Sequence, residues 1–165
     1  MSDFVMMTDS CCDLSAELAA ELELEVLPLR LELEGRSYRN LLDGGEIGFQ
    51  EFYGKVRSGA MPVTSAVNVG EFDAAMRPIL EAGKDILCLC FSSALSTTYQ
   101  SAVIAGRELE EDFPERKVRV VDSLCASMGQ GLFVWLCAQE KQKGKTLEEL
   151  AAYAGEIKGQ VCHWF

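Results

Sequence analysis

The sequence predicts an α/β fold in which a parallel β-sheet is flanked by helices. Short apolar runs alternate with segments of helical periodicity along most of the 165 residues. The run at residues 85–91 is apolar almost throughout, which is typical of a strand covered on both faces. Small polar residues follow the apolar runs, as expected where the strands of such a sheet lead into loops.

The first part of the chain is predicted to contain a strand, a helix and an extended segment. Residues 4–7 form a short apolar run that ends in polar residues, which indicates a buried strand leading into a loop. Residues 15–24 have helical spacing, and either Asp13 or Ser15 is available as the N-cap. Residues 25–34 alternate between apolar and polar side chains, which predicts extended structure that ends in a glycine turn.

The middle of the chain is predicted to be mostly helix and loop. Residues 36–45 are polar and contain glycine, so we expect a surface loop. Residues 47–57 predict a short amphipathic helix, and residues 61–65 predict a connector because Pro62 blocks a helix there. Residues 69–82 carry one apolar helical face and predict a helix that ends at a glycine.

The last part of the chain continues the alternation of strands and helices. The expected elements are a hydroxyl-rich loop at 92–98, a helix to about 111, a strand at 118–121, a helix at 126–142, and a helix from the N-cap Thr146 to about 157. Residues 161–165 are predicted to begin a further strand. A domain seldom ends in such a run, so we expect the chain to be a fragment of a longer protein.

Composition and charge exclude several classes of function. The formal net charge of −11 argues against a nucleic-acid-binding protein, which needs clustered Lys and Arg. No run of about 18 uncharged apolar residues predicts a transmembrane helix, and the N-terminus lacks the features of a signal peptide. We therefore expect a cytoplasmic protein without stable membrane insertion. Its seven cysteines are expected to be reduced and mostly small core residues.

Hydroxyl and carboxylate side chains follow three of the predicted strands. These strand ends are Thr8-Asp9-Ser10, the segment from Ser92 to Thr98, and Asp122-Ser123. The carboxyl ends of parallel strands share one edge of the sheet, where open α/β sheets bind ligands, and the connector with Thr64-Ser65 could reach the same edge. Neutral hydroxyl donors and helix N-termini suit a phosphate or a carboxylate. The same residue types also cap helices and form turns, so both interpretations stay open.

Catalytic and metal-binding patterns are weak by comparison. The single histidine is His163, and no Gly-x-Ser-x-Gly segment is present, which argues against a serine hydrolase. Gly144-Lys145-Thr146 lacks the first glycine of a phosphate loop and follows a helix. Cys88 and Cys90 have strand spacing without a second ligand pair, so we expect neither a metal nor a cofactor. Cys11 is interpreted as structural.

An ordered set of motifs resembles the DegV family of fatty-acid-binding proteins. The motifs are Thr8-Asp9-Ser10 with Asp13-Leu14, Pro28-Leu29, Pro62-Val63-Thr64-Ser65 with Glu71-Phe72, the segment from Ser92 to Ala102, and Val121-Asp122-Ser123 with Met128-Gly129-Gln130-Gly131. Many members have glycine where Ala94 and Thr97 stand here, so Thr97 adds a Cβ atom and a hydroxyl group to this loop. Family members are also nearly twice as long, so residues 1–165 would form the N-terminal lobe, and the last residues would begin a second lobe.

The resemblance implies a fatty acid held between two lobes. The family's carboxylate-binding hydroxyls correspond to Thr64 and Ser93, with Ser65 and Ser96 as further candidates. Some relatives present the bound lipid to a fatty acid kinase, which phosphorylates the carboxylate. The resemblance therefore implies a carrier of long-chain fatty acids and no enzyme activity of its own.

Two other interpretations remain open at this point. The chain could be an enzyme on a small phosphorylated or carboxylated metabolite, with Asp9 or Asp122 as the acid or base. It could also be a structural half-protein that binds nothing until a second lobe is present.

Overall fold

Four parallel strands form the central sheet of the protein in the computed structural model, which describes residues 4–164. The strand order is β2-β1-β6-β7. The strands are β1 (Phe4–Asp9), β2 (Leu24–Leu27), β6 (Asp85–Cys90) and β7 (Val118–Asp122). In the register, Thr8 of β1 lies between Val26 of β2 and Leu89 of β6, so the polar ends of the strands meet at one edge.

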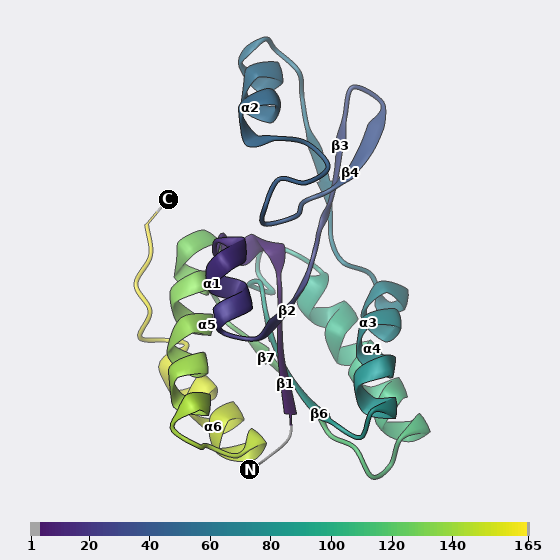
Figure 1. Cartoon of the computed structure of the whole chain (residues 1–165), viewed down its shortest axis with the longest axis vertical. Coiled ribbons are helices and arrows are strands. Elements are labelled where there is room, and N and C mark those ends of the chain that lie inside the picture. The colour runs from purple at the N-terminus through teal and green to yellow at the C-terminus, as the bar shows by residue number, and fades with distance from the viewer. Residues whose placement is uncertain (1–3, 165) are drawn as a thin grey trace.

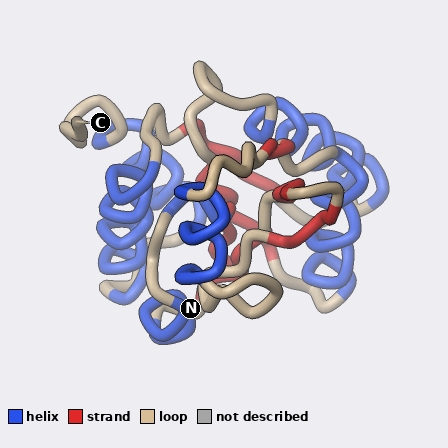
Figure 2. Tube along the Cα trace, turned by 90° about the horizontal axis from the view of Figure 1, so that it is seen from above, coloured by secondary structure: helices blue, strands red, loops and turns tan. Residues whose placement is uncertain are grey.

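Helices cover both faces of this sheet (Figure 2). The first face carries α1 (Ala16–Glu21), α5 (Ser127–Gln142) and α6 (Leu147–Ile157). The second face carries α3 (Val69–Glu81) and α4 (Thr98–Asp112). A 3-10 turn, η1 (Ser10–Cys12), joins β1 to the loop before α1. This arrangement confirms the predicted parallel sheet flanked by helices.

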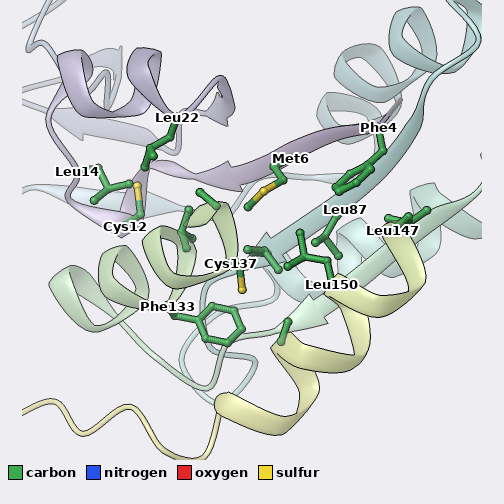
Figure 3. Close-up of a cluster of buried hydrophobic side chains, with 14 residues drawn as sticks. Phe4, Met6, Cys12, Leu14, Leu22, Leu87, Phe133, Cys137, Leu147 and Leu150 are labelled. Atoms are coloured by element: carbon green, nitrogen blue, oxygen red, sulfur yellow. The ribbon is translucent and has the colours of Figure 1, made fainter. Parts of the chain in front are cut away.

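Side chains of β6 alternate between the two cores, as the period of a β-strand requires. Leu87 and Leu89 pack in the core beneath α5 and α6, part of which is drawn in Figure 3. Ile86, Cys88 and Cys90 pack in the core beneath α3 and α4. All five side chains are at most 1% exposed, which explains why the run is continuously apolar in sequence.

A smaller unit, residues 29–66, projects from this body and is called the arm below (Figure 1). It contains the strands β3 (Arg30–Leu33), β4 (Arg36–Arg39) and β5 (Val63–Ser65) and the helix α2 (Phe49–Arg57). The strands form an antiparallel sheet in the order β4-β3-β5. No residue of α2 is buried, which distinguishes it from the long helices of the body.

The arm corrects two predictions from the sequence. Residues 36–45 were expected to be a loop, yet they include β4, and the expected connector at 61–65 includes β5. Glu34 and Gly35 both have positive φ, of 53° and 78°, which is the backbone of a two-residue hairpin turn. The sequence interpretation treated Gly35 as an ordinary end of the extended segment and so missed the returning strand.

The extended segment predicted at residues 25–34 divides between the two sheets. β2 joins the parallel sheet and β3 joins the antiparallel one, with Pro28 at the crossing. Residues 161–164 contain no strand, contrary to the prediction, and Phe165 lies outside the described residues.

The predicted helices are present, and their caps explain where two of them begin. The hydroxyl of Ser15 accepts the N–H of Leu18 at 3.2 Å, so Ser15 and not Asp13 caps α1. Thr146 and Glu149 form a reciprocal capping box at the start of α6. None of the helices within residues 4–164 is long and apolar enough to cross a membrane.

Candidate functional site

A cavity of about 590 Å³ lies between the arm and the body, beside the carboxyl ends of β1 and β6. Cys11 follows β1, and Phe91 follows β6, and both line it. Its volume falls in the range of about 300–1,000 Å³ that is typical of small-molecule sites. The site therefore has the position that the sequence predicted for ligand binding, at the edge where parallel strands end.

Apolar side chains from both units form most of the wall. The apolar lining residues are Leu29, Leu31, Leu41, Ile47, Phe49, Phe52 and Tyr53 from the arm, and Phe91 and Leu95 from the body. Phe49, Phe52 and Tyr53 are spaced at i, i+3 and i+4, so they share one face of α2. This face was visible in the sequence as amphipathic spacing, but its role as a cavity wall was not predicted.

Thr64 and Ser65 both line the cavity, and both carry free hydroxyl groups. They lie on β5, where Thr64 pairs with Leu31 and Ser65 with Arg30 of β3. Both residues are exposed, and neither hydroxyl has a hydrogen-bond partner within the described part of the chain. Each can therefore donate to a ligand without giving up an internal contact.

Ser96 and Thr97 line the cavity at the start of α4. The hydroxyl of Ser96 lies 2.9 Å from that of Thr98 and accepts the Thr98 N–H at 3.2 Å. Thr97 occupies the N-cap position without a side-chain capping bond. The first turn of α4 carries no acidic residue, so the positive end of the helix dipole is not neutralised there. Thr97 was not among the predicted site residues, although it stands in the hydroxyl-rich loop.

Ser93 is the one predicted carboxylate-binding residue that does not line the cavity. Its side chain is half-buried, and its N–H donates to Oδ1 of Asp122 at 3.2 Å. The structure thus gathers Thr64, Ser65 and Ser96 around one space, whereas Ser93, in the same loop as Ser96, does not line it.

Two ionic side chains border the cavity, and both are already engaged. Arg39 binds Glu46 through its Nε and its backbone N–H, each at 2.5 Å, and these contacts lower the pKa of Glu46. Asp13 accepts a hydrogen bond from the Ser127 hydroxyl at 2.6 Å. Neutral hydroxyl groups are therefore the free polar groups best placed for a ligand.

Thr8, Asp9 and Ser10 lie behind the cavity wall and are at most 1% exposed. Asp9 accepts hydrogen bonds from the backbone N–H groups of Phe91 at 2.8 Å and Cys11 at 3.1 Å. Nε2 of Gln130 donates to Oδ1 of Asp9 at 3.2 Å and to the Thr8 hydroxyl at 3.1 Å. The motif that predicted a ligand site thus fixes the residues that line it.

These contacts weaken the interpretation of Asp9 or Asp122 as an acid or base. Neither lines the cavity. Burial raises the pKa of Asp9, while its hydrogen bonds to Phe91, Gln130 and Cys11 oppose that shift. Asp122 accepts the N–H groups of Ser93 and Leu124 at 3.2 and 3.0 Å, so it serves as a cap for two loops.

Cysteines near the cavity are poor nucleophiles and no metal site accompanies them. Burial raises the pKa of Cys11 and, to about 11, that of Cys12, so both stay protonated near neutral pH. All seven cysteines are free. Within residues 4–164, no group of three or more His, Cys, Asp or Glu side chains is arranged to hold a metal ion.

The motif Met128-Gly129-Gln130-Gly131 also acquires a physical explanation. A Cβ atom at Gly131 would lie 2.5 Å from the carbonyl oxygen of Cys12, so only glycine lets α5 approach η1 this closely. That approach brings Gln130 to Thr8 and Asp9.

Comparison with known proteins identifies similar chains. A DegV domain-containing protein of Clostridium perfringens is 39% identical over 165 residues, which is the whole of this chain and 56% of that protein. The solved structure described as fatty acid binding of a DegV family protein from Thermus thermophilus has 34% identity and a TM-score of 0.82, covering 95% of this chain and 54% of that one. A stearic-acid-binding protein from Eubacterium ventriosum has 26% identity and a TM-score of 0.83, covering 92% and 52%. The chain spans about half the length of the relatives it matches.

The family model described as "Uncharacterised protein, DegV family" matches residues 3–165, which is nearly the entire sequence. Together with the 39% identity to the Clostridium perfringens protein, this match shows that the chain belongs to the DegV family.

Proposed function

We propose that this chain binds a long-chain fatty acid in the cavity between the arm and the body. The observation that carries the proposal is the combination of apolar walls with free hydroxyl groups in one space of about 590 Å³. Members of the family with solved structures are described as fatty-acid-binding proteins, which supports the same ligand.

The two parts of the ligand would be held by different forces. Each methylene removed from water contributes roughly 0.8 kcal/mol, so the tail supplies most of the affinity when it packs on residues such as Leu31 and Phe52. The carboxylate would be oriented by hydroxyl donors. Thr64 and Ser65 are the best placed, Ser96 is next, and Ser93 would need its loop to shift.

The proposal includes a role as a carrier and no covalent chemistry by the chain itself. Hydroxyl donors hold a carboxylate less firmly than an Arg or Lys partner would, which leaves its oxygens available for transfer chemistry. We propose presentation to a separate fatty acid kinase in the cytoplasm, with the chain as the N-terminal lobe of a longer protein. Free cysteines agree with a reducing compartment.

Native mass spectrometry of protein purified from bacterial cells tests the ligand. We expect a co-purified mass of a long-chain fatty acid, or uptake of added palmitate or oleate. A ligand-free mass that does not change when either lipid is added would contradict the proposal.

Hydroxyl variants test the head-group contacts. Thr64→Val and Ser65→Ala should each weaken palmitate binding about fivefold, because each removes one hydrogen bond of about 1 kcal/mol. Ser37→Ala is the matched control, since Ser37 is an exposed hydroxyl on the same antiparallel sheet and does not line the cavity. Equal affinities for all three variants and the unaltered chain would refute the assigned contacts.

Kinase presentation needs a separate assay. A purified bacterial fatty acid kinase with ATP should form acyl phosphate from palmitate only when this protein is present. Acyl phosphate can be trapped with hydroxylamine and measured. Equal product with and without the protein would contradict the carrier role.

A further inference from the structure

Ser10 is a buried residue whose side chain reaches the base of the arm. It ends the Thr8-Asp9-Ser10 motif and is 1% exposed, and it does not line the cavity. Its hydroxyl oxygen accepts the N–H of Leu29 at 3.0 Å and a hydrogen from Nδ2 of Asn40 at 3.2 Å. One oxygen atom of the body therefore binds two residues of the arm.

Leu29 and Asn40 are the two ends of the β3–β4 hairpin. Leu29 directly precedes β3, and Asn40 directly follows β4. The N–H of Asn40 donates to the carbonyl of Leu29 at 2.8 Å, which closes the hairpin at this point. Ser10 therefore binds both ends of the hairpin at its base. The hairpin itself, β3 and β4, projects from the body in Figure 1.

Apolar packing and one ion pair also hold the arm: Leu29 belongs to the core beneath α3 and α4, and Leu42 packs against the core beneath α5 and α6. α2 buries no residue, so it adds little packing. An ion pair joins Arg30 of β3 to Glu71 of α3 at 2.8 Å, but the two side chains are 51% and 27% exposed, and such pairs are weak. The Leu29 N–H, in contrast, is buried and would lose its partner entirely if the Ser10 oxygen were removed.

Ser10 is itself held in a fixed place by its neighbours. The preceding residue, Asp9, accepts the N–H groups of Cys11 and Phe91, so the turn that contains Ser10 is closed locally and is tied to the residue that follows β6. Phe91 and Cys11 form the body wall of the cavity, and Leu29 and Asn40 belong to its arm wall. Ser10 thus connects the body wall to the arm wall through hydrogen bonds that lie outside the cavity.

We propose that Ser10 is a positioning residue that fixes the arm on the body and thereby sets the width of the cavity. The first half of this inference concerns the arm alone. The second half rests on the proposed function, because it concerns how tightly the cavity retains a fatty acid.

Hydrogen exchange of the backbone amides tests the first half without any ligand. In Ser10→Ala, amides at residues 29–40 should exchange at least tenfold faster, while those of β6 keep their protection. Asn40→Ala removes only one of the two donors at an exposed position, so it should fold and give a smaller increase confined to the same residues. Ala154→Gly in α6 is the control, because it lowers overall stability far from the arm.

The outcomes separate a positioning role from a general loss of stability. Selective acceleration at residues 29–40 in the Ser10 and Asn40 variants, absent in Ala154→Gly, supports the inference. An acceleration spread evenly over the body and the arm, or none in either variant, overturns it. If Ser10→Ala does not fold, Asn40→Ala decides by the same criterion.

Palmitate release tests the second half. The dissociation rate measured by stopped flow should rise severalfold in Ser10→Ala and stay within twofold of the unaltered chain in Ala154→Gly. An unchanged rate together with a loosened arm overturns the link between Ser10 and cavity width. If the unaltered chain binds no palmitate, the proposed function fails, and the exchange experiment still decides what Ser10 does to the arm.

Discussion

The body and the arm are built from different kinds of contact. The body has a large buried core on each face of its parallel sheet, including aromatic and aliphatic side chains with no exposed surface. The arm has a small antiparallel sheet and a helix without a buried residue. The difference suggests that the body supplies the stability of the fold and that the arm, with exposed aromatic side chains at the cavity, supplies much of the ligand contact.

The largest expected effect is the loss of stability that follows when a buried side chain of the body is removed. Phe133 of α5 is fully buried, so Phe133→Ala should lower the free energy of unfolding by about 3–5 kcal/mol. Phe49→Ala is the matched change in the arm, where the side chain is 54% exposed, and it should have a small effect. Urea unfolding followed by circular dichroism measures both. Similar losses from the two variants would remove the distinction between body and arm.

The second prediction is a loss of palmitate affinity with little change in the free energy of unfolding. Phe52 of α2 is half-buried and lines the cavity, so Phe52→Ala should weaken palmitate binding about tenfold. Its unfolding free energy should change by about 1 kcal/mol or less. Calorimetric titration and urea unfolding of the same sample measure the two quantities. Strong destabilisation without weaker binding would assign α2 to the fold and not to the ligand.

The pH dependence of stability should reveal the buried carboxyl group of the body. Burial raises the pKa of Asp9 above its unfolded value of 3.8, so the native protein binds this proton more readily than the unfolded chain. The contribution of Asp9 to stability therefore decreases as pH rises through the native pKa. Relative to Asp9→Asn, the unaltered chain should gain stability as the pH is lowered from 7.

The difference between these two proteins isolates Asp9 in that measurement. Surface carboxylates with lowered pKa values, such as Glu148 and Asp73, contribute stability that the protein loses on acidification. Both proteins contain these groups, so their contributions cancel in the difference. Unfolding in urea at several pH values from 7 to 4 gives the difference. A constant difference across that range would contradict the raised pKa.

The smallest expected effect comes from the ion pairs beside β7. Arg119 binds Glu148 at 2.8 Å and Glu110 at 3.0 Å, and all three side chains are a third or more exposed. Arg119→Ala should lower the unfolding free energy by about 1 kcal/mol or less, and added salt should shrink the difference. A larger loss that does not depend on salt would mean that packing of the Arg119 stem contributes to the body.

The sequence predicted the body better than the arm for a physical reason. β6 is a continuous apolar run, and α6 is amphipathic and begins at the capping box of Thr146 and Glu149, so local pattern and tertiary packing agree there. β4 and β5 are short and largely exposed. The pairing of β4 with β3 depends on the positive φ of Glu34 and Gly35, a conformation that glutamate seldom adopts, and β5 pairs with β3 from a distant part of the sequence.

The candidate site was predicted in part. Thr64, Ser65 and Ser96 line one cavity, but Thr64 and Ser65 reach it from β5 of the arm and not from the edge of the parallel sheet, and their role in holding a carboxylate stays a prediction. The role of Ser10 could not be predicted, since its partners Leu29 and Asn40 are distant in sequence and meet it only through the hairpin. The position of the aromatic face of α2 could not be predicted either, because its spacing indicates an amphipathic helix but not the surface that the helix faces.

The most direct test is to locate bound palmitate by NMR in this 18.1 kDa chain. With methyl-labelled Leu and Ile, nuclear Overhauser effects should connect the lipid tail to Leu31 and Ile47 in the cavity wall. Leu87 and Leu150, which are buried in the body core, should show none. Contacts of palmitate with the core residues, or with neither set, would contradict the cavity between arm and body as the fatty-acid site.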